Sequence, residues 1–184
     1  MTALIFDCDG TLADTMPAHY RAWLDILGPY GISLPEARFY SLGGMPTGKI
    51  IELLLAEAGK VADVARLTRL KEEAFIAQMD AVRPIARVVE VARLAHGRVP
   101  MAVASGGHRH LVELTLRQIG ILEWFPVIVG AEDTARHKPE PDVFLEAARR
   151  LGVEPPDCTV YEDTDLGLEA ARRAGMRSVD VRTM

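Results

Sequence analysis

Short runs of consecutive apolar residues recur along the chain and predict buried β-strands. The first run covers residues 3–6 and is followed by two acids and a glycine. Apolar runs of this length, without polar alternation, are typical of parallel strands that are buried on both faces. Four further runs of this kind lie at 101–104, 127–129, 159–161 and 178–181.

From residue 84 onward, these runs alternate with stretches in which apolar residues return every three or four positions. Such helical patterns lie at 88–92, 111–116, 143–148 and 168–171. Alternation of strands and helices with short loops predicts a parallel sheet that is covered on both faces. The predicted fold class is therefore α/β, with a Rossmann-like, doubly wound parallel sheet.

Residues 16–82 interrupt this rhythm, because helical stretches follow one another there without a convincing strand. They lie at about 17–28, 35–41, 47–58 and 62–81, separated mainly by glycines. A strand followed by a helical segment and then by more strands predicts an insertion into an α/β core. We predict a core domain of residues 1–14 and 84–184, with a helical cap domain of residues 15–83 inserted after the first strand.

Composition narrows the class of protein. The 184 residues are 49% hydrophobic, which suits one domain with a modest insertion, and no apolar run reaches the roughly 18–20 residues that span a bilayer. The net charge of −5 argues against a nucleic-acid binder. Cys8 and Cys158 suggest neither a disulfide framework nor a zinc site. We expect a cytoplasmic monomer without a signal peptide that binds neither nucleic acid nor membranes.

Polar residues of complementary chemistry follow the predicted strands. Since ligands of open parallel sheets bind at the carboxyl ends of the strands, we expect these residues to meet at one edge. They are Asp7 and Asp9 after the first strand, Ser105 and Gly106 after the second, Lys138 after the third, and Glu162 and Asp163 at the end of the fourth.

Together these groups describe a site for a phosphoryl group. Clustered carboxylates need a cation, and oxygen ligands suit Mg²⁺. Ser105 and the Gly106 amide offer donors to an anion, and Lys138 supplies a positive charge. A carboxylate at a strand tip can attack phosphorus, while a second one handles protons. Each group alone fits a turn, a helix cap or a solvated charge, but one site explains all four strand ends.

These motifs resemble the haloacid dehalogenase superfamily, in its β-phosphoglucomutase-like branch with a helical cap after strand one. The matching segments are Asp7-Cys8-Asp9-Gly10-Thr11-Leu12, Ser105, Lys138-Pro139 and Glu162-Asp163 with Gly167 and Ala170-Ala171. Within the branch, the chain is most similar to sugar phosphatases of the fructose 1-phosphate and 6-phosphogluconate type. Cys8 departs from the usual larger aliphatic residue and fits as a small buried side chain.

The resemblance implies a role for each matching residue. Asp7 would be the nucleophile and Asp9 the general acid and base. The Asp7 and Asp163 carboxylates and the Asp9 backbone carbonyl would bind Mg²⁺. Ser105 and Gly106 would hold phosphoryl oxygens, Lys138 would neutralise charge, and Glu162 would support these groups without binding the metal directly.

Cap residues carry weaker signals. Thr15 and His19 share a helix face that we expect to look toward Asp9, with His19 contributing to substrate binding. Gly44 and Lys49 are candidates for the cap side of the substrate site. Met16 and Met45 suit the pocket wall or the cap core. Trp23 and Trp124 are expected in the core, and His108, His110 and His137 at solvated loops or helix ends. The chain has 17 arginines but only four lysines, so each lysine is a slightly stronger candidate for a chemical role. The lysines are Lys49, Lys60, Lys71 and Lys138.

Three functions fit these observations to different degrees. A Mg²⁺-dependent phosphatase for small sugar phosphates, acting through an aspartyl phosphate, fits best. In a sugar phosphomutase of this branch, a lysine and an arginine of the cap hold the second phosphate, but those positions are Gly43 and Thr47 here, and Lys49 would substitute only in part. A receiver-like phosphoacceptor module would lack both the helical insertion and the Asp-x-Asp pair. A dehalogenase would not need Asp9.

Overall fold

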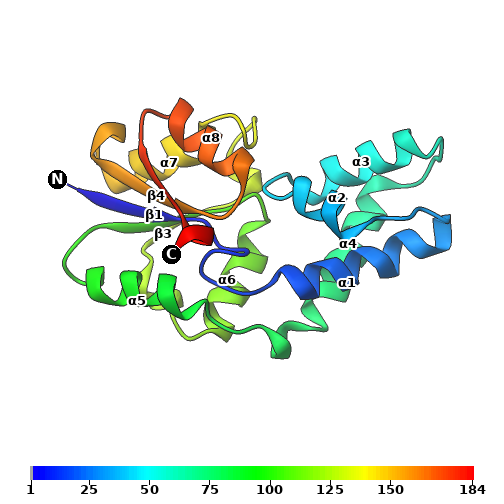
Figure 1. Cartoon of the computed structure of the whole chain (residues 1–184), viewed down its shortest axis with the longest axis horizontal. Coiled ribbons are helices and arrows are strands. Elements are labelled where there is room, and N and C mark those ends of the chain that lie inside the picture. The colour runs from blue at the N-terminus through cyan, green and yellow to red at the C-terminus, as the bar shows by residue number, and fades with distance from the viewer. Residues whose placement is uncertain (1) are drawn as a thin grey trace.

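A computed structural model describes residues 2–184. Its centre is a parallel sheet of five strands, as the apolar runs predict, and the structure gives their order as β3-β2-β1-β4-β5 (Figure 1). On the central strand, Ile5 pairs with Ala102 on one side and Val160 on the other. The strands are β1 (Ala3–Phe6), β2 (Met101–Ala104), β3 (Val127–Val129), β4 (Cys158–Glu162) and β5 (Arg177–Asp180).

Helices cover both faces of the sheet, which confirms the α/β prediction. On one face α7 (Asp142–Leu151) and α8 (Asp165–Arg173) pack small alanines and Phe144 against Ile5 and Val160. On the other face α5 (Ala86–Ala95) and α6 (Arg109–Gln118) pack against Phe6 and Val103. β1, β2 and β3 are largely buried between these two layers, which explains their lack of polar alternation, whereas the edge strand β5 is exposed at Arg177 and Ser178.

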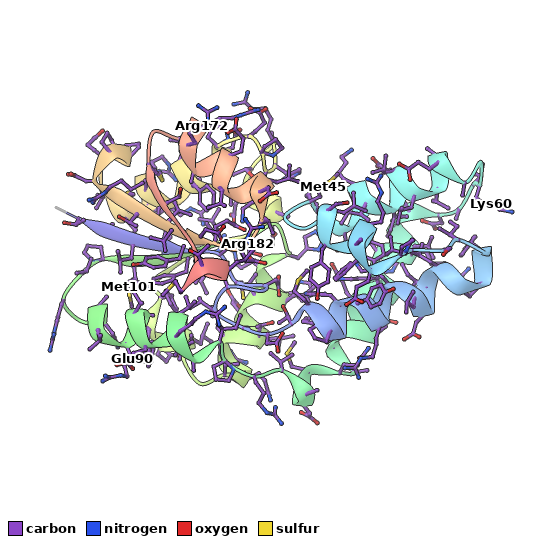
Figure 2. The ribbon with its side chains drawn as sticks, viewed as in Figure 1. Met45, Lys60, Glu90, Met101, Arg172 and Arg182 are labelled. Atoms are coloured by element: carbon purple, nitrogen blue, oxygen red, sulfur yellow. The ribbon has the colours of Figure 1, made fainter. Side chains whose placement is uncertain are left out.

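The inserted segment forms a group of helices beside the sheet. It contains α1 (Met16–Leu27), α2 (Glu36–Ser41), α3 (Thr47–Glu57) and α4 (Val64–Ile76). These cap helices share an apolar core of their own, centred on residues such as Leu27, Ile51 and Leu67. Figure 2 shows Met45 on the side of the cap near the sheet and Lys60 at its far tip. The domain bounds at 15–83 stay a prediction.

One predicted helix is shorter than expected. The pattern over 62–81 predicts a single helix, but α4 ends at Ile76 and a 3₁₀ turn follows at Met79–Ala81. Met79 packs beside Leu111 and Leu114 of α6, so contact with the core turns the chain away from the helix axis. The apolar periodicity continues through this turn, and no proline or glycine marks the helix end.

Two adjacent connections join the cap to the core. The Asp14 amide donates to the Arg83 carbonyl at 2.8 Å, and the Ile85 amide donates to the Leu12 carbonyl at 2.9 Å. The cap therefore leaves and re-enters the core beside the carboxyl end of β1. No helix within residues 2–184 is long and apolar enough to cross a membrane.

Candidate active site

The loop after β1 places two aspartates in different surroundings. The Asp7 amide still donates to the Tyr161 carbonyl of β4 at 3.0 Å, so Asp7 continues the sheet. Gly10 then turns the chain with a φ of +84°. A side chain at Gly10 would overlap the carboxylate of Asp163, so this turn needs glycine both for its conformation and for space.

Lys138 connects two of the predicted carboxylates. Its Nζ lies 2.7 Å from Asp7 Oδ1 and 2.7 Å from Glu162 Oε2, and all three side chains are buried. Burial alone would lower the pKa of Lys138, but Asp7 and Glu162 raise it above its usual value. Lys138 is therefore held in its charged form behind Asp7.

Glu162 is bound at both of its oxygens. While Oε2 accepts from Lys138, Oε1 accepts from the Thr164 hydroxyl at 2.7 Å and the Thr164 amide at 2.9 Å. A side chain at Gly167 would overlap the Glu162 carboxylate, so the first turn of α8 lies directly against it. This fixed position suits a residue that orients Lys138.

Three acids form a cluster that fits a divalent cation. Carboxylate oxygens of Asp7, Glu162 and Asp163 lie within 4.8 Å of one another. Burial, then the charge of Glu162, raises the pKa of Asp7 well above its usual value and that of Asp163 to about 7. A single lysine does not balance three carboxylates, and an all-oxygen donor set suits Mg²⁺. The carboxylate of Asp9 is not part of this cluster.

Asp9 instead faces the cap, and both residues predicted to share its side of α1 contact it. The Thr15 hydroxyl donates to Asp9 Oδ1 at 2.7 Å, and His19 Nε2 lies 3.1 Å from the same oxygen. Although burial opposes it, His19, Thr15 and the charge of Lys71 together lower the pKa of Asp9 to about 2. Asp9 is therefore ionised in this structure.

A buried lysine of α4 completes this network and was not predicted as a site residue. Lys71 Nζ lies 2.7 Å from His19 Nδ1, and the imidazole stacks on Phe75 with 3.9 Å between ring centroids. An ammonium group can only donate, so His19 is neutral, with Nδ1 accepting and Nε2–H donating to Asp9. Burial lowers the pKa of Lys71 to about 8. Two sequence signals pointed to it: the scarcity of lysine, and its position on the apolar face of α4 between Leu67 and Phe75.

The loop after β2 brings backbone amides beside the aspartates. Ser105 Oγ accepts a hydrogen bond from the Gly107 amide at 3.0 Å. A side chain at Gly106 would overlap the carbonyl oxygen of Gly44, so this loop touches the cap directly. Ser105 and Gly106 thus line the same space as Asp7, as predicted from their strand ends.

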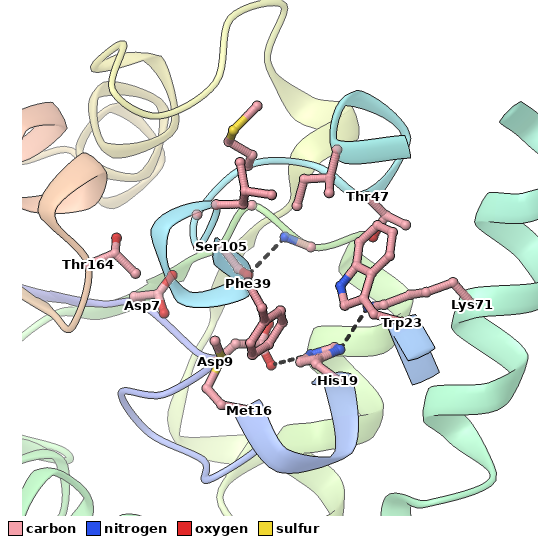
Figure 3. Close-up of a pocket in the computed structure, with 17 residues that line it drawn as sticks. Asp7, Asp9, Met16, His19, Trp23, Phe39, Thr47, Lys71, Ser105 and Thr164 are labelled. Atoms are coloured by element: carbon pink, nitrogen blue, oxygen red, sulfur yellow. Dashed lines mark hydrogen bonds and ion pairs between the residues drawn. The ribbon is translucent and has the colours of Figure 1, made fainter. Parts of the chain in front are cut away.

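A cavity of about 80 Å³ lies between the core and the cap (Figure 3). Polar groups of the core lie at one end, and the cap closes it with largely apolar side chains. The core contributes Asp7, Asp9, Ser105, Gly106, Gly107 and Thr164, and the cap contributes Met16, His19, Trp23, Phe39, Leu42, Gly43, Gly44, Met45, Thr47, Ile50 and Lys71.

The structure also places five other residues that the sequence singled out. Met16 and Met45 line the cavity, and Trp23, expected only in the core, is both buried and part of the wall. Lys49 does not line it; its Nζ binds Glu52 at 2.9 Å on the exposed side of α3. His108 is not merely solvated, because its Nδ1 contacts Glu72 of α4 at 2.6 Å.

Known proteins are similar to this chain over most of its length. A fructose-1-phosphate phosphatase of Escherichia coli K12, YqaB, is 41% identical over 98% of this chain and 96% of its own length. A β-phosphoglucomutase of Bacillus subtilis 168 is 30% identical over 98% of this chain and 83% of its own. The crystal structure of CbbY from Rhodobacter sphaeroides in complex with phosphate superimposes with a TM-score of 0.85, at 28% identity, over 97% of this chain and 84% of that one.

A family model supports the same assignment over nearly the whole sequence. The model for haloacid dehalogenase-like hydrolases matches residues 4–181, which include the core, the cap and every strand end described above. This chain belongs to the haloacid dehalogenase-like hydrolases.

Proposed function

We propose that this enzyme is a Mg²⁺-dependent phosphatase that hydrolyses small sugar phosphates through an aspartyl phosphate on Asp7. The observation that carries the proposal is the placement of Asp7 and Asp9 on one cavity with different partners. Lys138 binds Asp7, whereas Thr15 and His19 bind Asp9. Separate surroundings suit separate roles as nucleophile and as proton carrier.

In the first step, an oxygen of Asp7 forms a bond to phosphorus and the ester bond to the sugar breaks. Lys138 occupies Oδ1, which leaves Oδ2 free to attack. The departing alkoxide takes a proton from Asp9. Asp9 is ionised before substrate binds, so it takes up that proton from solvent as the complex forms, because the negative charge of the arriving phosphate raises its pKa.

In the second step, Asp9 removes a proton from a water molecule. The water oxygen bonds to phosphorus as the bond to Asp7 breaks, which releases phosphate and restores the carboxylate of Asp7. Thr15 and His19 hold the Asp9 carboxylate toward the cap during both steps. The closed cap limits the number of water molecules that reach phosphorus, so the water molecule activated by Asp9 is the one that reacts.

The carboxylates of Asp7 and Asp163, with the backbone carbonyl of Asp9, would hold the metal. When bound, Mg²⁺ supplies positive charge that offsets the charge of the transferring phosphoryl group. Ser105 and Gly106 would hold phosphoryl oxygens at the same end of the cavity. Thr11 donates to Asp163 Oδ1 at 2.9 Å and keeps that carboxylate in place.

A phosphatase fits the cap better than a phosphomutase does. A mutase must hold the second phosphate of a bisphosphate intermediate, yet Thr47 and Gly43 line the cap side here and Lys49 lies outside the cavity. Among the lining residues of the cap, Lys71 carries the one ammonium group, and His19 and two aromatic rings surround it. A sugar with a single phosphate suits these surroundings.

The test is a panel of hexose, pentose and sugar-acid monophosphates, assayed with Mg²⁺ and with EDTA. We expect Mg²⁺-dependent release of inorganic phosphate, with fructose 1-phosphate among the substrates. Each reaction is also analysed for isomerised sugar phosphate. Isomer formation without free phosphate would replace the phosphatase by a mutase.

A further inference from the structure

We infer that the indole N–H of Trp23 recognises a hydroxyl group of the substrate. The inference rests on the proposed function and deepens it. It predicts that the cavity prefers phosphate esters of a sugar or polyol to those of a plain alkyl or aryl group. Trp23 would thus be a specificity-determining residue of the cap.

The position of Trp23 on α1 places it away from the reacting atoms. Met16, His19 and Trp23 follow one another at intervals of three and four, and all three line the cavity. Trp23 lies four residues, or roughly 6 Å along the helix, beyond His19, which contacts Asp9. It therefore faces a part of the substrate several bonds from phosphorus.

The orientation of the Trp23 ring is fixed by its neighbours. The side chain belongs to the apolar core of the cap, and the residue is only 3% exposed. Lys71 Nζ lies over the ring, 5.5 Å from its centroid. A donor held in this way loses little freedom when a ligand binds, so its hydrogen bond contributes efficiently to recognition.

The N–H of this ring has no acceptor within residues 2–184. The nitrogen also keeps some accessible surface, because it is not one of the fully buried side-chain atoms without a hydrogen-bond partner. Figure 3 shows the nitrogen-bearing edge of Trp23 turned into the space between Phe39 and Thr47. A buried indole normally finds a hydrogen-bond partner, so an unpaired one on a cavity wall points to a ligand.

The rest of this wall explains why the donor matters. Phe39, Leu42, Met45 and Ile50 are apolar and cannot replace the water that a hydroxyl group loses on entering the cavity. Trp23 offers one partner on this side, and the Thr47 hydroxyl offers another. Apolar walls with a few placed polar groups are typical of sites that bind the carbon face and the hydroxyls of a sugar.

The test compares two substrates in the Trp23→Phe variant, which keeps an aromatic ring and removes the N–H. Fructose 1-phosphate carries hydroxyl groups, and p-nitrophenyl phosphate carries none. We expect kcat/KM to fall roughly 10-fold for the sugar phosphate and less than about 2-fold for the aryl phosphate. Equal losses for both substrates, or no loss for the sugar, would overturn the inference. Trp124→Phe, in the core, is the matched control.

A binding measurement covers the case in which Trp23→Phe does not fold. The chain has two tryptophans, so Trp23 is the sole one in a protein that combines Trp124→Phe with Asp7→Asn. We expect fructose 1-phosphate to change its emission and inorganic phosphate to leave it unchanged. Identical emission with both would overturn the inference. Wild-type enzyme that hydrolyses p-nitrophenyl phosphate but no sugar phosphate would overturn the proposed function itself.

Discussion

Lys71 Nζ lies 2.7 Å from His19 Nδ1, and the opposite nitrogen of the same ring lies 3.1 Å from Asp9 Oδ1. A residue of α4 thus orients the proton carrier of the proposed reaction without touching it. Because the ammonium group requires Nδ1 to accept, it fixes the tautomer in which His19 donates to Asp9.

The first prediction concerns this network. Lys71→Met should lower kcat by roughly 10- to 100-fold with little change in KM for p-nitrophenyl phosphate, because Asp9 loses its fixed orientation. The pKa of Lys71 is about 8, so wild-type activity should decline as the pH rises through that value, and this decline should be absent in the variant. Lys60→Met, at the exposed tip of the cap, is the control. Wild-type kinetics in Lys71→Met would contradict the assignment.

The second prediction concerns the contact of the cap with the core at Gly106. Gly106→Ala would place a methyl group on the carbonyl oxygen of Gly44, so the cap cannot seat fully. We expect kcat/KM to fall on the order of 10²-fold, with the circular dichroism of the protein unchanged. Gly28→Ala meets no atom within 4 Å and serves as the control. Equal activity of the two variants would show that this contact does not matter.

The third prediction links the metal to stability. Without metal, the pKa of Asp163 is about 7 in the folded state, compared with its usual 3.8. Between these two pH values, Asp163 keeps its proton in the folded state and has released it in the unfolded chain. This contribution makes the metal-free protein less stable as the pH rises from about 4 to 7. A cation that binds the ionised cluster removes this cost. Mg²⁺ should therefore stabilise the protein more at high pH.

Differential scanning fluorimetry with Mg²⁺ and with EDTA measures this effect. At a hundredfold excess over Kd, Mg²⁺ should raise Tm by roughly 5–10 °C near pH 8 and by clearly less near pH 5.5. In Asp163→Asn the Mg²⁺ effect should be small at both values. A shift that does not depend on pH, or that survives in this variant, would argue against the acidic cluster as the metal site.

The fourth prediction concerns the ion pair between cap and core at Glu72 and His108. The hydrogen bond from His108 lowers the pKa of Glu72, and the bond to Glu72 raises that of His108. His110 Nε2 lies 3.8 Å from the same Glu72, and the charges of Glu132 and Lys71 also act on His108. With the histidine pKa raised, the pair holds the cap fully below about pH 6.5 and weakens as the pH rises through the folded pKa.

Hydrogen exchange of α4 reports on this contact. Exchange in the wild type should accelerate as the pH rises above neutrality, after correction for the intrinsic rate. In His108→Gln it should be fast throughout and without that step. His96→Gln leaves the cap contacts intact, since His96 packs against Trp124 in the core, and should behave like the wild type. A pH step that persists in His108→Gln would assign it to another group.

The sheet could be predicted from the sequence because its central strands are buried on both faces. Runs such as 3–6 and 101–104 then carry no polar residues, and the strand ends place Asp7, Ser105 and Lys138 together by topology alone. The ends of the helices were harder to predict from the sequence. The end of α4 at Ile76 depends on contacts with α6, which periodicity does not record.

The cap side of the site was less predictable than the core side. Lys71 is buried only because Trp23, His19 and Phe75 surround it, and two of these residues come from a different helix. The spacing within α4 did carry a signal, because Lys71 lies four residues after Leu67 and four before Phe75, the other two buried residues of this helix. Trp23 was expected in the core because a buried aromatic side chain and a cavity wall have the same apolar pattern.

The most direct test of the proposed function is phosphate release by Asp7→Asn. With fructose 1-phosphate and Mg²⁺, the wild-type protein should release inorganic phosphate, and Asp7→Asn should reduce the rate by more than about 10³-fold, because an amide oxygen is a poor nucleophile. Asp14→Asn, an exposed neighbour of the same loop, should retain wild-type activity. Phosphate release by Asp7→Asn at the wild-type rate would contradict Asp7 as the nucleophile and, with it, the aspartyl-phosphate mechanism.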